Sequence, residues 1–213
     1  AGLRISSDRN YSDKKLYSTA FPIGSLISST WDKNLAFEIG KAMGSEAKSY
    51  GIDIILAPGM NLQRNPLCGR NFEYFSEDPV LSGNIAAGIV NGIQTNNVGA
   101  CPKHFVVNNQ ETDRMKNNAL VDERTLREMY LKGFEIMIKK SQPWAIMSSY
   151  NKLNGKYVTE NKRLLTEVLR KDWGFQGAVM TDWFGGGDTV ESIKAGNDLI
   201  EPGTSKVLED LEK

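Results

Sequence analysis

Short apolar segments alternate with longer amphipathic segments along most of this chain, and this alternation constrains the fold more than any other feature. The apolar segments lie at 54–58, 99–105, 144–149 and 177–181, with a weaker fifth at 198–201. Most are continuously apolar, which is typical of strands covered on both faces. Strands that alternate with helices build a parallel sheet with crossover helices, so we expect an α/β fold.

The amphipathic segments carry recognisable helix boundaries. Apolar residues recur at helical spacing between 35 and 50, and Gly51 follows as a left-handed cap. Asp78-Pro79 is typical of an N-cap followed by the first helical residue. Two further helices are predicted to begin near Asp122 and at Asn161. Together these helices would cover the sheet.

Polar clusters follow the predicted strands, at 63–70, 103–114, 148–154 and 181–188. Clusters that converge on one face from several strand ends are typical of the carboxyl-terminal mouth of a barrel. The number of strand-and-helix units also suits an open doubly wound sheet, but the cluster positions favour a (β/α)8 TIM-type barrel. Residues 1–5 resemble the end of a strand whose start is absent, so we expect the barrel to be incomplete in this chain.

Composition excludes several kinds of partner. The chain has 26 Lys and Arg against 26 Asp and Glu, so it lacks the basic surface that nucleic acid or an anionic membrane requires. No apolar run approaches the roughly 20 residues that cross a bilayer. One His and two Cys are too few for a zinc site, so we expect no metal. Cys68 and Cys101 are expected to be free, buried and inert.

Asp182 directly follows an apolar strand segment, in the text AVMTDW. A carboxylate at a strand tip lies where a nucleophile, a general base or a magnesium ligand would be placed. Glycines and Asp188 follow closely, so a helix N-cap is an equally good interpretation of Asp182 from position alone.

Lys103 and His104 also lie at a strand end, and Arg114 follows eleven residues later. Such cations can hold the hydroxyl groups of a polar substrate. Lys103 could instead form a Schiff base if its pKa is depressed. His104 could also be a general base, but a lone histidine is more often a structural hydrogen-bond donor. The adjacent pair Lys103-His104 is more informative about a site than either residue alone.

Two other segments carry polar groups of interest. Segment 69–79 places Arg70 and Glu73 among aromatic residues, and a buried arginine there would need a carboxylate partner. Segment 185–188 has the sequence GGGD, which matches neither common phosphate-binding pattern. A flexible loop beside the site is therefore favoured over a phosphate cradle.

Five motifs, taken together and in order, resemble the barrel domain of family 3 glycoside hydrolases, the β-glucosidase group. They are GRNFEYFSEDP, KHFVVNNQETDR, MSSYNKLNG, VMTDW and AGNDLIEPG. The resemblance extends from about Gly2 to Gly203. It implies that residues 1–213 form a catalytic barrel domain, part of a larger multidomain enzyme.

The resemblance also implies residue roles. Asp182 would be the nucleophile of a retaining glycosidase, which needs one carboxylate nucleophile and one carboxylic acid about 5 Å apart. Tyr150 would lie beside Asp182 and orient it. The other expected substrate-binding residues grip sugar hydroxyls or line the apolar rim: Arg70, Lys103, His104, Arg114, Met147 and Trp183. No cofactor and no metal are implied.

The chain departs from the family pattern in two respects. The Asp-Gly-Pro segment that usually precedes the text beginning at Ala1 is missing. The family's acid/base Glu lies on a separate α/β sandwich domain, which would come from the same gene or from another chain. Glu73 and Glu111 are not assigned this role, because both are expected to have structural partners.

These features predict an exo-β-glucosidase that removes a terminal non-reducing β-D-glucosyl residue from a β-glucoside or short β-linked oligosaccharide. The family also has a subgroup that acts on N-acetylglucosaminides and carries its acid/base His in a barrel loop shortly after the Lys-His-Phe motif. The sequence after Lys103-His104-Phe105 contains no second His, so the chain is not placed in that subgroup. The alternatives are a β-xylosidase, an aldolase-like barrel using Lys103, and a sugar-binding barrel without turnover. The sequence does not decide whether the protein forms a homo-oligomer. We expect a soluble enzyme of bacterial type with a cytoplasmic location.

Overall fold

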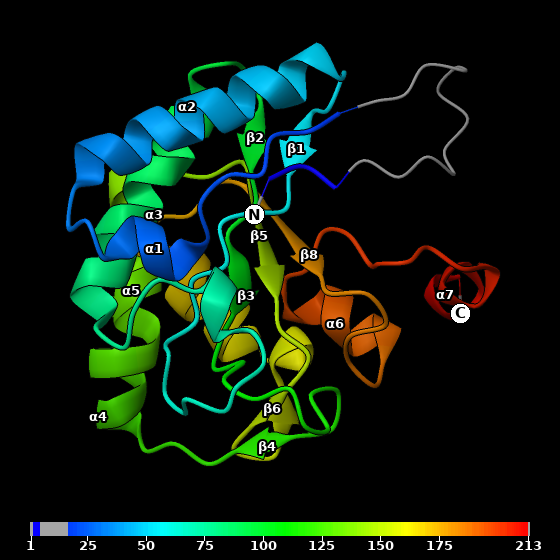
Figure 1. Cartoon of the computed structure of the whole chain (residues 1–213). Coiled ribbons are helices and arrows are strands. Elements are labelled where there is room, and N and C mark those ends of the chain that lie inside the picture. The colour runs from blue at the N-terminus through cyan, green and yellow to red at the C-terminus, as the bar shows by residue number, and fades with distance from the viewer. Residues whose placement is uncertain (1, 5–16, 213) are drawn as a thin grey trace.

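The computed structural model describes residues 2–4 and 17–212, which form an α/β fold with strands inside and helices outside (Figure 1). The strand end expected at residues 1–5 lies partly outside this range, and Gly2, Leu3 and Arg4 are not in a strand. In the described part of the chain, no helix is both long enough and apolar enough to span a membrane.

The interior strands pair in parallel, as the alternating pattern predicts. β1 (Ile54–Ile55) pairs with β2 (Gly99–Ala100). A second sheet has the order β3 (Lys103–Phe105), β5 (Ala145–Ser148) and β8 (Ala178–Thr181). Single parallel bridges extend this array at both ends, because Gly59 pairs with Lys103 and Met180 pairs with Leu199.

Three predicted strands are much shorter than expected. The segment 54–58 is a strand only at Ile54–Ile55. The segment 99–105 divides into β2 and β3 at Pro102, because proline has no N–H group to donate to a neighbouring strand. The chain still runs beside the preceding segment, since Cys101 N–H donates to Ile55 O and Lys103 N–H donates to Pro58 O. The weak segment 198–201 contributes only the bridge at Leu199.

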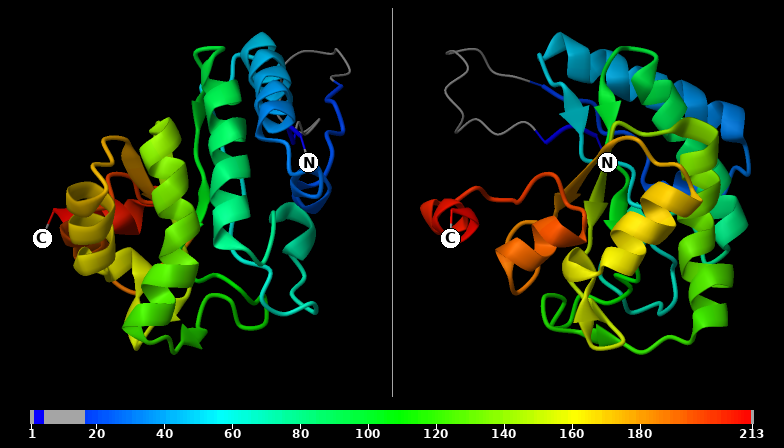
Figure 2. Two further views of the ribbon diagram at one scale, coloured as in Figure 1. Left: turned by 90° about the vertical axis from the view of Figure 1, so that its left-hand side faces the viewer. Right: turned by 180° about the vertical axis from the view of Figure 1, so that it is seen from behind.

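The longest helices form a layer on one side of the strands. α2 (Lys33–Ser49) packs against α3 (Pro79–Gln94), and α3 packs against α5 (Leu131–Ser141) (Figure 2). Asp78 caps α3 as predicted, since its carboxylate accepts the Val80 N–H. Gly51 follows α2 with φ +68°, which confirms the left-handed cap.

The remaining helical elements are short, except for η4, which has ten residues. A helix begins after Asp122, as predicted, but it consists of three consecutive elements, α4, η2 and α5, of which Asp122 caps the first. The predicted helix after Asn161 is π-helical. The helical elements are α1 (Gly24–Ser28), η1 (Asn71–Glu73), α4 (Glu123–Thr125), η2 (Leu126–Tyr130), η3 (Val158–Glu160), η4 (Arg163–Asp172), α6 (Thr189–Ala195) and α7 (Ser205–Leu211).

A small third sheet lies at the edge of the molecule and was not predicted. It contains β4 (Asn118–Ala119), β6 (Lys152–Leu153) and β7 (Lys156–Tyr157). β6 and β7 form an antiparallel hairpin through Asn154-Gly155, whose φ angles are both positive. Asn-Gly is the preferred pair for such a turn, so the sequence signal was present.

The two cysteines are free, but they differ in burial. Cys101 is fully buried, and burial raises the pKa of its thiol to about 12. Cys68 is only partly buried, because it lies in the loop before η1 rather than on a strand. The expectation of burial is therefore correct for Cys101 and wrong for Cys68.

Close backbone contact holds α2 against α3. A Cβ atom built on Gly92 of α3 would lie 2.1 Å from Phe37 O, and one on Gly40 of α2 would lie 2.3 Å from Ile89 O. Real Cβ atoms do not approach backbone oxygen this closely, so both positions require glycine. The absence of side chains here sets the distance between the two helices.

We expect Gly92→Ala to destabilise the protein by about 1–3 kcal/mol, the usual cost of overpacking a tight contact. In an unconstrained helix the same change would stabilise by up to about 1 kcal/mol. The control is Ser45→Ala, because Ser45 lies on the exposed face of α2 and should tolerate alanine. Urea denaturation measures both free energies of unfolding, and a stabilised Gly92→Ala variant would contradict the close-contact argument.

Candidate active site

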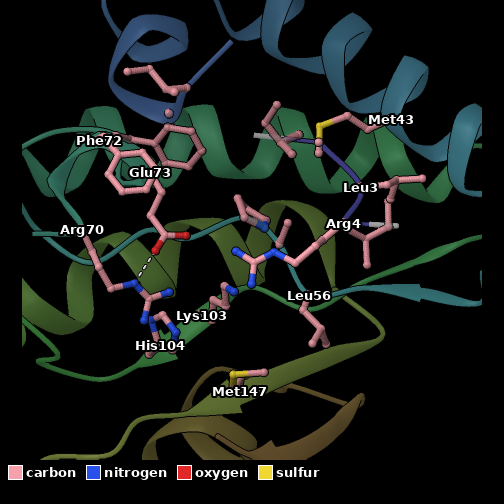
Figure 3. A pocket seen from close by; sticks show the side chains of 18 of the residues that line it. Leu3, Arg4, Met43, Leu56, Arg70, Phe72, Glu73, Lys103, His104 and Met147 are labelled. Carbon is pink, nitrogen blue, oxygen red and sulfur yellow. Dashed lines mark hydrogen bonds and ion pairs between the residues drawn. The ribbon is translucent and has the colours of Figure 1, made fainter. Parts of the chain in front are cut away.

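One cavity of about 750 Å³ lies where the carboxyl ends of β3, β5 and β8 meet. All eight residues that the sequence pointed to line this cavity: Arg70, Lys103, His104, Arg114, Met147, Tyr150, Asp182 and Trp183. The physical reason is that parallel strands present their carboxyl ends at one edge, so segments far apart in sequence converge there. Figure 3 shows Arg70, Lys103, His104 and Met147 around this cavity.

Asp182 follows β8 and is nearly buried, with 7% of its surface exposed. The Trp183 N–H donates to Asp182 Oδ1 at 2.8 Å, and Tyr150 is hydrogen-bonded to the same carboxylate. His104 Nε2 lies 3.5 Å from Asp182 Oδ2. Asp182 is not a helix cap, because α6 is capped by Asp188.

His104 lies on β3 and is buried. Burial lowers the pKa of the imidazole well below its usual value, and the nearby charges of Arg70, Lys103 and Arg114 lower it further. The ring is therefore neutral near pH 7. Its other nitrogen, Nδ1, lies 3.3 Å from the Tyr74 hydroxyl.

The cations of the site are balanced by carboxylates. Arg70 forms an ion pair with Glu73, drawn as the dashed line in Figure 3, which provides the partner expected for a buried arginine. Arg114 Nη1 lies 3.1 Å from Glu111 Oε2. Burial lowers the pKa of Lys103, and the Glu73 carboxylate opposes that shift. Glu73 and Glu111 thus have the structural partners expected of them.

Tyr150 connects the cations to the carboxylate of Asp182. Its ring lies beneath the Arg114 guanidinium, with 4.9 Å between the guanidinium carbon and the ring centroid. Burial, together with the neighbouring Asp182 charge, raises the pKa of Tyr150 to about 12, so the hydroxyl stays protonated. Met147 is buried in the cavity wall, whereas Trp183 is 38% exposed at the rim.

The glycine-rich segment 185–188 cannot cradle a phosphate in this arrangement. The N–H groups of Gly187 and Asp188 donate to Glu160 Oε1, at 2.7 and 2.9 Å. These amides are therefore already occupied by a carboxylate. Among the described residues, no group of three or more His, Cys, Asp or Glu side chains could hold a metal ion.

Sequence reasoning missed several residues of the cavity. Arg4 and Phe72 line it, and Figure 3 shows the Arg4 guanidinium extending toward the middle of the cavity. Tyr74 and Asn61 hold His104 from behind. Tyr74 was visible as an aromatic residue within the charged segment 69–79, whereas no local signal marks Asn61.

Acid should destabilise this fold through His104. Below an ordinary pKa of about 6.5 the unfolded chain binds a proton at His104 and the folded chain does not. The free energy of unfolding therefore falls as pH falls, by up to about 1.4 kcal/mol per pH unit. His104 is the single histidine of the chain, so no other imidazole contributes.

The measurement is urea denaturation of the wild type and of His104→Gln from about pH 7 to about pH 5. The variant lacks the imidazole, so only the wild type should lose stability through this group as pH falls. The free energy of unfolding of the wild type minus that of the variant should therefore decrease. A difference that stays constant over this range would show that folding does not suppress protonation of His104.

Comparison with known proteins finds similar sequences over most of this chain. Residues 6–201 match the family described as glycosyl hydrolase family 3 N terminal domain. The thermostable beta-glucosidase B of Acetivibrio thermocellus is 50% identical over 184 residues, which are 86% of this chain and 24% of that protein. An exo-alpha-(1->6)-L-arabinopyranosidase of Bifidobacterium longum is 48% identical over 190 residues, which are 89% of this chain and 25% of that protein.

The chain is also similar to a solved structure of a beta-glucosidase. Beta-glucosidase 3B from Thermotoga neapolitana, in complex with glucose, superposes with a TM-score of 0.96 and 56% identity over 100% of this chain and 31% of that chain. The chain spans about a quarter of the length of the curated relatives it matches. On this evidence the chain belongs to glycosyl hydrolase family 3 and contains residues of that family's N-terminal domain.

Proposed function

We propose that this chain is the nucleophile-bearing barrel domain of a retaining exo-β-glucosidase. The observation that carries the proposal is the Asp182 carboxylate, which lies at the end of β8 in a cavity shared with Arg70, Lys103 and His104. Similar proteins named as beta-glucosidases support the choice of activity. The parallel array of strands supports closure into a (β/α)8 barrel when further chain is present.

In the proposed reaction an Asp182 oxygen attacks the anomeric carbon of a terminal β-D-glucosyl residue. The bond from that carbon to the aglycone oxygen breaks, and a carboxylic acid protonates the departing oxygen. Water then attacks the anomeric carbon of the covalent glycosyl-enzyme, and the bond from that carbon to Asp182 breaks. The proton of the water returns to the acid/base group that had protonated the aglycone oxygen. The hydrogen bonds from Trp183 N–H and Tyr150 would keep the attacking carboxylate oriented.

The carboxylic acid would come from outside this chain. Glu73 and Glu111 are already paired with Arg70 and Arg114, so both are poor candidates for a proton donor. The proposal places the acid/base Glu on an α/β sandwich domain, encoded in the same gene or carried by another chain. The larger size of the relatives leaves room for such a domain.

The cations would hold the hydroxyl groups of the sugar at the cleavage point. Arg70, Lys103 and Arg114 bring positive charge to the cavity, and the neutral His104 also lines it, beside Asp182. Contacts to hydroxyls that strengthen in the oxocarbenium-like transition state raise turnover as well as affinity. Trp183 and Met147 would offer apolar surface to the C–H faces of the ring.

Two other activities have some support. The relatives from Bifidobacterium are named for action on an arabinopyranose, so a pentopyranoside such as a β-xyloside is the second candidate substrate. The lowered pKa of Lys103 is the observation that favours a Schiff-base aldolase. The aldolase places the covalent bond on nitrogen rather than on a carboxylate oxygen, so labelling separates the two chemistries.

We expect an activated 2-deoxy-2-fluoro-β-glucoside to label the full-length enzyme on the peptide that contains Asp182. Fluorine at C2 destabilises the oxocarbenium-like transition state, so the covalent intermediate accumulates. Peptide mass analysis locates the adduct, and Asp182→Asn is the control that should remain unlabelled. A borohydride-trapped adduct on Lys103, without label on Asp182, would replace the proposal with the aldolase.

We expect Lys103→Ala in the full-length enzyme to lower kcat/KM for an aryl β-glucoside by about 10- to 150-fold. This range corresponds to loss of about 1.5–3 kcal/mol from a charged hydrogen bond. Lys48→Ala is the matched control, because Lys48 is exposed on α2 and does not line the cavity. Steady-state kinetics of both variants make the test, and near wild-type kcat/KM in Lys103→Ala would count against the assigned role.

A further inference from the structure

We propose that Tyr74 is a positioning residue that selects the tautomer of His104, so that the ring proton lies on Nε2 and faces Asp182. Tyr74 does this by donating its hydroxyl hydrogen to His104 Nδ1. The importance of this arrangement for turnover rests on the proposed role of Asp182 as nucleophile, but the tautomer itself does not.

The imidazole of His104 has polar neighbours on both sides. Nδ1 lies 3.3 Å from the Tyr74 hydroxyl and 3.3 Å from Asn61 Oδ1. Nε2 lies 3.5 Å from Asp182 Oδ2. A neutral imidazole carries one N–H, so it can donate on one side only and must accept on the other. The neighbours therefore decide where the proton lies.

Asn61 is held in one orientation by the main chain of His104. Its Nδ2 donates to His104 O at 2.8 Å, and its Oδ1 accepts the His104 N–H at 2.8 Å. The amide oxygen must therefore face Nδ1, where it is an acceptor that favours the Nδ1–H tautomer. Asn61 is the competitor of Tyr74 at this nitrogen.

Tyr74 supplies the opposing donor. Its side chain is fully buried, and burial raises the pKa of the hydroxyl well above its usual value, so the O–H is retained. The ring meets the imidazole edge-on, with 6.3 Å between centroids and 76° between planes. The hydroxyl lies 3.3 Å from Nδ1, within reach of a hydrogen bond to that nitrogen.

The two tautomers differ in how many groups they satisfy. With the proton on Nε2, Tyr74 donates to Nδ1 and Nε2–H points at the Asp182 carboxylate. With the proton on Nδ1, the ring donates to Asn61 Oδ1, and the Nε2 lone pair faces a carboxylate oxygen, which is repulsive. The Tyr74 hydroxyl then also loses its acceptor at Nδ1 inside the core, and an unpaired buried polar group is costly.

The selected tautomer completes the set of donors around Asp182. Oδ1 accepts the Trp183 N–H, Oδ2 faces His104 Nε2–H, and Tyr150 bonds the same carboxylate. Donors on both oxygens restrict rotation of the carboxylate before substrate binds. Tyr74 therefore acts on Asp182 through His104, without lining the cavity itself.

The direct test is the ¹⁵N chemical shifts of histidine ring nitrogens in labelled protein, which distinguish a protonated from an unprotonated nitrogen. His104 is the single histidine of the chain, and in the full-length protein its signals are those lost in His104→Gln. We expect the wild type to carry its proton on Nε2. A wild-type ring protonated on Nδ1 would overturn the proposal without recourse to any variant.

Tyr74→Phe removes the donor and keeps the buried ring. Asn61 Oδ1 is then the remaining partner at Nδ1, so we expect the proton to shift to Nδ1 in a large fraction of the molecules. Tyr130→Phe is the control, because Tyr130 is also buried but, unlike Tyr74, is not the tyrosine beside His104 Nδ1, and the change should leave the His104 signals unchanged. An unchanged Nε2–H ring in folded Tyr74→Phe would overturn the proposal.

Kinetics of the full-length enzyme connect the tautomer to turnover. We expect Tyr74→Phe to lower kcat for an aryl β-glucoside about tenfold with little change in KM, whereas Tyr130→Phe should change neither kcat nor KM.

The proposed function and the proposed role of Tyr74 can fail separately. If labelling misses Asp182 while the tautomer shifts as expected, the function is wrong and the positioning stands; if Asp182 is labelled and the tautomer does not shift, the positioning alone is wrong.

Discussion

The parallel register of β3, β5 and β8 is the constraint on which the rest of this structure depends. Lys103 pairs with Met147, and Ser148 pairs with Thr181, so the residues that follow these strands leave the sheet at the same level. Tyr150 and Asp182 therefore face each other although they lie on separate strand-and-helix units. Backbone hydrogen bonds, rather than contacts among the charged groups, bring the site together.

Burial of charge then decides how the cavity is organised. Arg70 and Arg114 are each neutralised by a carboxylate from the same loop, three residues away. Ions that lose contact with water need a partner, and this requirement applies mainly to Arg70, because the Arg114 side chain is 40% exposed. Lys103 and Asp182 have no such pairing within their own loops. Under the proposed function they are the groups left for a substrate, and His104, 3.5 Å from Asp182, stays neutral.

The helical layer positions the strands without contributing side chains to the charged cluster. α2 and α3 approach so closely that glycine is required at their crossing, and α3 in turn packs on α5. On the inner side, Phe105 meets Phe134 of α5 at 5.3 Å between ring centroids, directly after His104 on β3. The packing of a large aromatic residue thus fixes the strand that carries Lys103 and His104.

The sequence by itself determined the features that depend on near neighbours. Apolar runs indicated the interior strands, Asp78 and Asp122 indicated helix starts, and the motifs around Arg70, Lys103 and Asp182 indicated a shared site. Pro102, which interrupts a strand, and the Asn154-Gly155 turn are local signals of the same kind. Such features are readable because a cap, a turn or an apolar run is a property of a few consecutive residues.

Only the tertiary structure decided which groups meet across the chain. Tyr74 and Asn61 contact His104 from 30 and 43 residues away, and Glu160 occupies the amides of a loop 27 residues further on. The tertiary structure also showed that Asp182 faces the cavity and does not cap a helix. The position of Asp182 in the sequence was equally consistent with both. These outcomes depend on the packing of several elements at once, and no short segment of sequence records that packing.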